Sequence, residues 1–170
     1  MMPRSVRLSI ATLFGVIVFL FKMFLPTPVD KMFIAVQALL LALGSLTIGG
    51  FGATYVALVG GLLTTVWRPA FAPFSLVFAL IYGFTVDIFF RVFGVKREGK
   101  VRTVRSVIAL TLSTAITGIL SMSVTVMMGL IPMIPILYLI IILVGILNGA
   151  VAGCLTPILW NRYLIYYFKK

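Results

Sequence analysis

The chain has 170 residues, 62% of them hydrophobic and 10% charged, with 14 Lys and Arg against three Asp and Glu. Soluble domains carry about 25% charged residues, so this composition excludes a water-soluble fold. The net charge of +11 does not indicate nucleic-acid binding, because the basic residues flank apolar stretches instead of covering a polar face. The sequence therefore predicts an all-α, polytopic membrane protein with one transmembrane domain over residues 1–170 and no soluble domain.

Six apolar stretches approach the roughly 20 residues that a membrane-spanning helix needs. In chain order, the expected transmembrane helices cover residues 8–25, 31–47, 51–66, 73–90, 106–130 and 135–160. We expect the first helix to be retained, because no small-residue cleavage site of a signal peptide precedes Lys22. The second and third helices are short and are separated by Gly49, Gly50 and Gly52, so a re-entrant hairpin is the alternative for this pair.

The basic residues mark the ends of these stretches. Two precede the first helix, three follow the last one, and the central cluster comprises Arg91, Lys96, Arg97, Lys100, Arg102 and Arg105. Because cytoplasmic loops are rich in Lys and Arg, six helices with both termini inside place 11 of the 14 positive charges in the cytoplasm. We therefore expect a multi-pass protein of the plasma membrane whose basic loops contact anionic lipid.

Few residue types in this chain perform chemistry. It has no His, one Cys (Cys154) and three acids, Asp30, Asp87 and Glu98, so a haem, copper or zinc site cannot form. A Ser nucleophile would lack a His base. We therefore expect neither an enzyme nor a bound cofactor or metal.

Asp87 is the one acid inside an expected span, and an acid at membrane depth is a candidate functional residue. Arg91 follows four residues later, one helical turn on, so a structural ion pair between Asp87 and Arg91 is the favoured interpretation. A proton or cation site and a contact to a partner protein are the alternatives.

Polar and aromatic side chains in the expected spans predict a site for a small, flat, hydrogen-bonding ligand. Hydroxyls at spacings of three and four residues share one face of the fifth helix, and further candidates lie on the other helices. The predicted ligand-binding residues are Gln37, Trp67, Tyr82, Thr117, Ser121, Thr125 and Asn148. As alternatives, the hydroxyls bond to their own backbone, and Trp67 belongs to an interfacial aromatic belt.

Small residues recur at four-residue spacing, which permits close helix packing. For the third and sixth helices we expect internal packing. The whole chain also resembles the substrate-binding S component of energy-coupling factor (ECF) vitamin transporters. The resemblance is carried by six short helices, by Ala-Thr-Leu-Phe-Gly at 11–15, by Gly-Gly-Phe-Gly-Ala at 49–53, and by residues 149–157 followed by Arg162.

This resemblance implies a subunit that captures a micronutrient at the outer face and associates with a transmembrane coupling subunit and ATPase subunits. It implies that Ala11 and Gly15 dock the coupling subunit. The aromatic segment 67–74 is similar to that of members that take thiamine or its precursors. The sequence contains no ATP-binding P-loop motif, so energy would come from those partners.

Two other classes of function remain open. A non-catalytic structural or assembly subunit of a larger membrane complex needs only helices, small-residue faces and topology charges. A stand-alone channel is disfavoured, because no ring or series of charges is available to line a pore. An outward-opening polar cavity among helices four, five and six would favour ligand capture, and a solid apolar core would favour assembly.

Overall fold

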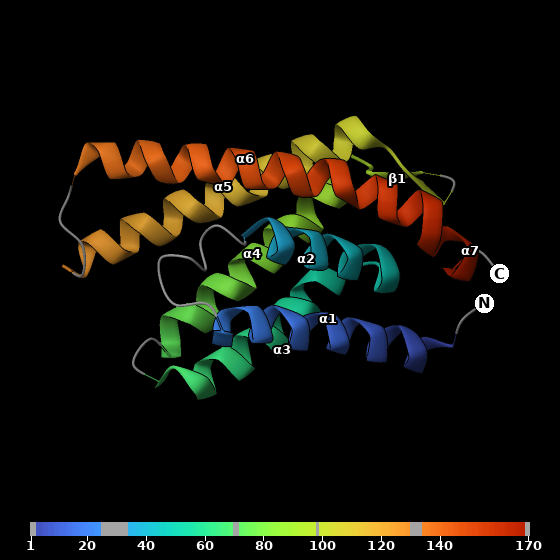
Figure 1. Cartoon of the computed structure of the whole chain (residues 1–170), viewed down its shortest axis with the longest axis horizontal. Coiled ribbons are helices and arrows are strands. Elements are labelled where there is room, and N and C mark those ends of the chain that lie inside the picture. The colour runs from blue at the N-terminus through green and yellow to red at the C-terminus, as the bar shows by residue number, and fades with distance from the viewer. Residues whose placement is uncertain (1–2, 25–33, 70–71, 98, 130–133, 169–170) are drawn as a thin grey trace.

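Helices make up most of the computed structural model, which describes residues 3–24, 34–69, 72–97, 99–129 and 134–168 (Figure 1). The six main helices within these residues are α1 Arg4–Phe24, α2 Ile34–Ile48, α3 Gly52–Trp67, α4 Ala72–Val92, α5 Thr103–Met127 and α6 Pro135–Leu159. The remaining elements are two strands, β1 Lys96–Arg97 and β2 Lys100–Val101, a π-helical turn Trp160–Leu164, and α7 Ile165–Phe168. The predicted all-α class is confirmed, and the helices begin and end close to the expected residues.

Helix length separates the six helices into two groups. α1, α4, α5 and α6 are long and apolar enough to cross a membrane. α2 and α3 have 15 and 16 residues, about 22–24 Å of helix, whereas the hydrocarbon core of a bilayer is about 30 Å thick. The four longer helices indicate that the protein is membrane-embedded. The six-span topology and its orientation stay predictions.

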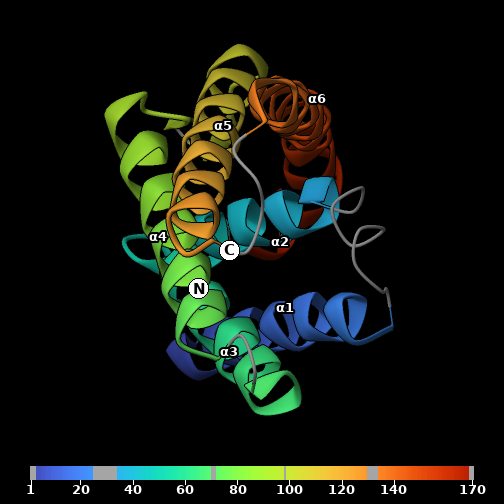
Figure 2. The ribbon, with the colours of Figure 1, turned by 90° about the vertical axis from the view of Figure 1, so that its left-hand side faces the viewer.

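α2 occupies the centre of the molecule. Figures 1 and 2 show it between α1 and α3 on one side and α5 and α6 on the other. Nine of its 15 residues are buried, and it packs against α3, α6 and α1. Its sequence is apolar around nearly the whole circumference, which is typical of a helix enclosed by other helices.

Glycines form the turn and the crossing between α2 and α3. Gly49 and Gly50 have φ angles of 74° and 60°, in the left-handed region that side chains other than glycine rarely adopt. A Cβ on Gly52 would lie 2.1 Å from the carbonyl oxygen of Gly44, so the two helix backbones are in contact. The close crossing holds α2 and α3 together as a compact pair.

Small residues also join the other helices. A Cβ on Gly61 of α3 would lie 3.1 Å from the Cβ of Ala79 on α4. A Cβ on Gly149 of α6 would lie 2.6 Å from the Cα of Thr111 on α5. The internal packing expected for the small residues of these two helices is confirmed.

The basic segment between α4 and α5, expected as a loop, contains an antiparallel hairpin. Lys96 pairs with Val101, and Arg97 pairs with Lys100. The hairpin lies at the same end of the bundle as the two chain termini (Figure 1). We call this the basic end of the molecule.

Candidate functional site within the helix bundle

The first described residues of α2 are half-buried and lie beside the middle of α6. Asn148 Oδ1 accepts a hydrogen bond from the backbone N–H of Ala35 (3.2 Å), and Asn148 Nδ2 donates to the carbonyl oxygen of Val144 (2.8 Å). The first N–H groups of a helix have no partner within the helix and carry partial positive charge. Asn148, halfway along α6, therefore satisfies a backbone donor in the first described turn of α2.

A polar contact joins α4 to α5, close to the part of α6 that carries Asn148. Tyr82 on α4 is buried, and its hydroxyl lies 3.4 Å from Thr114 Oγ1 on α5. Thr114 Oγ1 in turn faces Gly149, where a Cβ would lie only 2.7 Å away. Gln37 lies half-buried in the first turn of α2. Of the predicted ligand-binding residues, Tyr82, Asn148 and Gln37 thus lie on α4, α6 and α2, and α2 packs against both of the other helices.

The predicted hydroxyl face of α5 divides into two kinds of residue. Ser121 and Thr125 donate to the backbone oxygens of Gly118 (3.0 Å) and Ser121 (2.7 Å), which is the backbone-bonding alternative. Thr117 differs, because its buried Oγ1 has no hydrogen-bond partner within the described segments. Among the predicted hydroxyls of α5, Thr117 is therefore the one that could still form a hydrogen bond with a ligand.

Trp67 does not join this group. It ends α3, and 53% of its side-chain surface is exposed. In both ribbon views α3 lies on the opposite side of the bundle from α5 and α6. Its position agrees with the alternative that Trp67 is an interfacial residue at the end of a helix.

Asp87 has different partners from the one expected. Its Oδ1 accepts a hydrogen bond from the N–H of Ala53 (3.1 Å), and its Oδ2 accepts from the N–H and the hydroxyl of Thr54 (both 2.8 Å). Asp87, on α4, therefore caps the first turn of α3, where a negative charge is stabilised by the helix dipole. The guanidinium of Arg91 lies over the Phe51 ring instead, 5.6 Å from its centroid. The expected Asp87–Arg91 ion pair is corrected to a cap between two helices.

Ala11 and Gly15, the expected partner-docking pair on α1, are also placed differently. Ala11 is fully buried, and a Cβ on Gly15 would lie 2.7 Å from the Cβ of Val59 on α3. This face of α1 packs against α3 within the chain. The two residues are therefore unavailable to a separate coupling subunit in this conformation, which corrects the role implied by the family resemblance.

A second polar cluster, which sequence patterns did not indicate, lies at the basic end. Asn161 Oδ1 accepts from the N–H of Val101, and Asn161 Nδ2 donates to the carbonyl oxygen of Val101, both at 2.9 Å. Trp160, only 1% exposed, donates its indole N–H to the carbonyl oxygen of Gly99 (3.0 Å). The adjacent Trp-Asn pair after a long apolar run was the available signal, because an aromatic residue and an amide there are suited to anchoring a loop.

Lys96 connects this cluster to α2. Its Nζ lies 4.5 Å from the centroid of the Trp160 ring and donates to the carbonyl oxygen of Leu46 (3.2 Å). Burial lowers the pKa of Lys96, and the positive charge of Arg7 lowers it further. The basic end is therefore an ordered assembly of α2, the hairpin and the end of α6.

No known family, curated protein or solved structure matches this chain. Within the described residues, four helices are long and apolar enough to cross a membrane, which indicates a membrane-embedded protein.

Proposed function

We propose that this protein is the substrate-capturing membrane subunit of a micronutrient uptake transporter, with a vitamin or vitamin precursor, of the thiamine type, as substrate. The observation that carries the proposal is the N-terminus of α2, which lies beside Asn148 halfway along α6. Transporters commonly bind substrate near the membrane midplane, at the ends of helices that do not cross the whole bilayer. Energy would come from ATPase subunits acting through a transmembrane coupling subunit.

Two further features support this proposal. The first described turn of α2 is half-buried against α6, where backbone N–H groups could meet a ligand. Thr117 adds a buried hydroxyl without a partner in the described part of the chain. A small organic molecule with hydrogen-bonding groups on a flat ring matches these donors together with the aromatic Tyr82.

The test is ligand binding by the purified full-length protein. Native mass spectrometry and thermal shift are measured with thiamine, its pyrimidine and thiazole precursors, and a panel of other vitamins. We expect one compound to bind at one per chain and raise the melting temperature. Thr117→Val should weaken that binding about tenfold, the equivalent of about 1.4 kcal/mol, without lowering the stability of the ligand-free protein. Thr125→Val is the matched control, because the Thr125 hydroxyl already bonds to Ser121.

A second candidate is a non-catalytic assembly subunit of a larger membrane complex. It is favoured by the observation that Asn148, Ser121 and Thr125 satisfy their hydrogen bonds inside the chain. If no compound binds and the protein co-purifies with other membrane subunits in fixed stoichiometry, this second function replaces the first. Equal binding by the parent and Thr117→Val would place the ligand elsewhere and remove the proposed site.

A further inference from the structure

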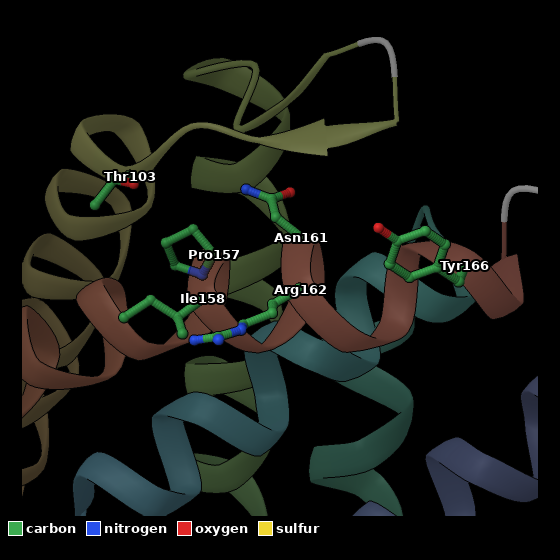
Figure 3. Close-up of a pocket in the computed structure, with 6 residues that line it drawn as sticks. All are labelled: Thr103, Pro157, Ile158, Asn161, Arg162 and Tyr166. Atoms are coloured by element: carbon green, nitrogen blue, oxygen red, sulfur yellow. The ribbon is translucent and has the colours of Figure 1, made fainter.

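A groove of about 490 Å³ lies on the side of α6 at the basic end (Figure 3). The lining residues are Thr103, Pro157, Ile158, Asn161, Arg162 and Tyr166. Thr103 begins α5, and the others belong to α6, the π-helical turn and α7. The groove is thus formed where the end of one helix passes the start of another.

The π-helical turn aligns the polar residues of this groove with the apolar ones. An α-helix has about 3.6 residues per turn, so residues four apart drift around its axis. The wider π turn over Trp160–Leu164 takes up more residues per turn and reduces that drift. Ile158, Arg162 and Tyr166 consequently line the same groove, and Figure 3 shows the Arg162 side chain running back along the helix toward Ile158.

Three polar groups of the groove have bonding capacity left. Both amide atoms of Asn161 are occupied by Val101, so Asn161 fixes the hairpin rather than a ligand. In contrast, no hydrogen bond is made within the described segments by the side chains of Thr103, Arg162 and Tyr166. The guanidinium is the donor suited to a phosphate group, and the two hydroxyls, which Figure 3 shows apart from it, are available to other oxygens of a headgroup.

Apolar side chains continue from the groove along the lipid-exposed face of α6. Leu147, Val151 and Leu155 are 64%, 51% and 41% exposed, and Ile158, which lines the groove, is 52% exposed. Their spacings of four, four and three residues place them on one face of the helix. This row of apolar side chains ends at the positively charged Arg162. A lipid has the same arrangement, an acyl chain followed by a headgroup.

The charge around the groove favours a negative headgroup. Asp87 is the only acidic residue within the described segments, and its carboxylate caps α3. The hairpin and the start of α5 contribute Lys96, Arg97, Lys100, Arg102 and Arg105 at the same end. Glu98, between the two hairpin strands in the sequence, lies outside the described residues, and it is one acid beside these five basic residues. Anionic lipids are attracted to basic segments at a membrane surface.

We propose that this groove is a binding site for one anionic phospholipid, with its phosphate on Arg162, with the rest of the headgroup toward the Thr103 and Tyr166 hydroxyls, and with an acyl chain along Ile158, Leu155 and Val151. The lipid would join the end of α6 to the start of α5. This site is separate from the proposed ligand site at the start of α2. It does not depend on the transport function.

The test is native mass spectrometry of the full-length, detergent-purified protein with added phosphatidylglycerol or phosphatidylcholine of identical acyl chains. We expect one phosphatidylglycerol per chain to be bound about tenfold more tightly than phosphatidylcholine. Arg162→Gln should remove this preference, and Arg162→Lys should retain part of it. Arg4→Gln is the matched control, since it removes an equal charge outside the groove and should leave the preference unchanged.

Melting temperatures of the four proteins show whether each is folded. If Arg162→Gln does not fold, Thr103→Val and Tyr166→Phe replace it, and each is expected to weaken phosphatidylglycerol binding several-fold. Equal binding of the two lipids by the parent protein overturns the proposal. So does an equal loss in Arg4→Gln, which would show diffuse attraction to charge. Displacement of the lipid by millimolar inorganic phosphate would identify a free anion, not a lipid, as the ligand.

Discussion

The Asp87 carboxylate accepts three hydrogen bonds from the first turn of α3, and so fixes where α3 begins against α4. Its location in an apolar span was enough to mark it as important, because an acid there needs partners. Its partners could not be predicted, since Ala53 and Thr54 precede it by more than 30 residues and meet it only through the packing of α3 on α4. Sequence spacing favoured Arg91 because only local neighbours are visible in a sequence.

Replacing Asp87 by Asn tests this cap. An amide has one acceptor oxygen, and its NH2 group would face the backbone donors of α3. We expect Asp87→Asn to destabilise the protein by about 1–3 kcal/mol, the cost of unsatisfied buried donors. Thermal unfolding in detergent measures the effect. Thr54→Val, which removes only one of the three bonds, should cost less. An unchanged melting temperature in Asp87→Asn would contradict a structural role for the cap.

At the scale of elements, proline and glycine signals predicted the helices well, because Pro26, Pro28 and the glycines at 49–52 interrupt the apolar runs. Tertiary features were missed. The hairpin has only two residues in each strand, and Asn161, 60 residues away, holds its second strand. No local pattern reveals such a partner. The packing partner of Gly15 was missed for the same reason, because a small-residue spacing shows that a helix can pack closely and leaves the partner unspecified.

Gly15→Leu distinguishes packing within the chain from docking of a partner. The Cβ position already overlaps Val59, so a larger side chain must push α1 away from α3. Such overpacking typically costs about 1–3 kcal/mol. We expect a lower melting temperature and a smaller monodisperse fraction in gel filtration for the isolated protein. Leu13→Phe, at a position that is 56% exposed on the same helix, serves as the control and should behave as the parent. A fully stable Gly15→Leu protein would reopen partner docking.

Proteolysis tests whether the two hydrogen bonds from Asn161 to Val101 stabilise the hairpin. Asn161→Leu removes both bonds to Val101, so the hairpin should open more often, and local opening exposes cleavage sites. We expect faster trypsin cleavage after Arg97 and Lys100, measured by mass spectrometry of the fragments. Arg162→Gln keeps these bonds and provides the comparison. Identical cleavage rates in Asn161→Leu and the parent would show that other contacts hold the hairpin.

For the whole molecule, the charge map predicts that the basic end faces the cytoplasm, and the structure places both termini and the hairpin together at that end. Labelling with a membrane-impermeant thiol reagent tests this orientation. In a Cys154→Ser background, cysteines at Thr27 and Ala70, which lie outside the described residues, should be labelled from outside the cell. A cysteine at the exposed Lys100 should be protected until the membrane is opened. Labelling of intact cells at Lys100 would reverse the orientation.

The contact between Asn148 and Ala35 has a consequence for biosynthesis. Ala35 is made more than a hundred residues before Asn148, so during synthesis its N–H group precedes the acceptor that α6 supplies. Arrival of the last long helix both covers the central helix and supplies the missing acceptor. A nascent chain that stops before α6 therefore lacks this acceptor and leaves α2 uncovered on the side where α6 packs.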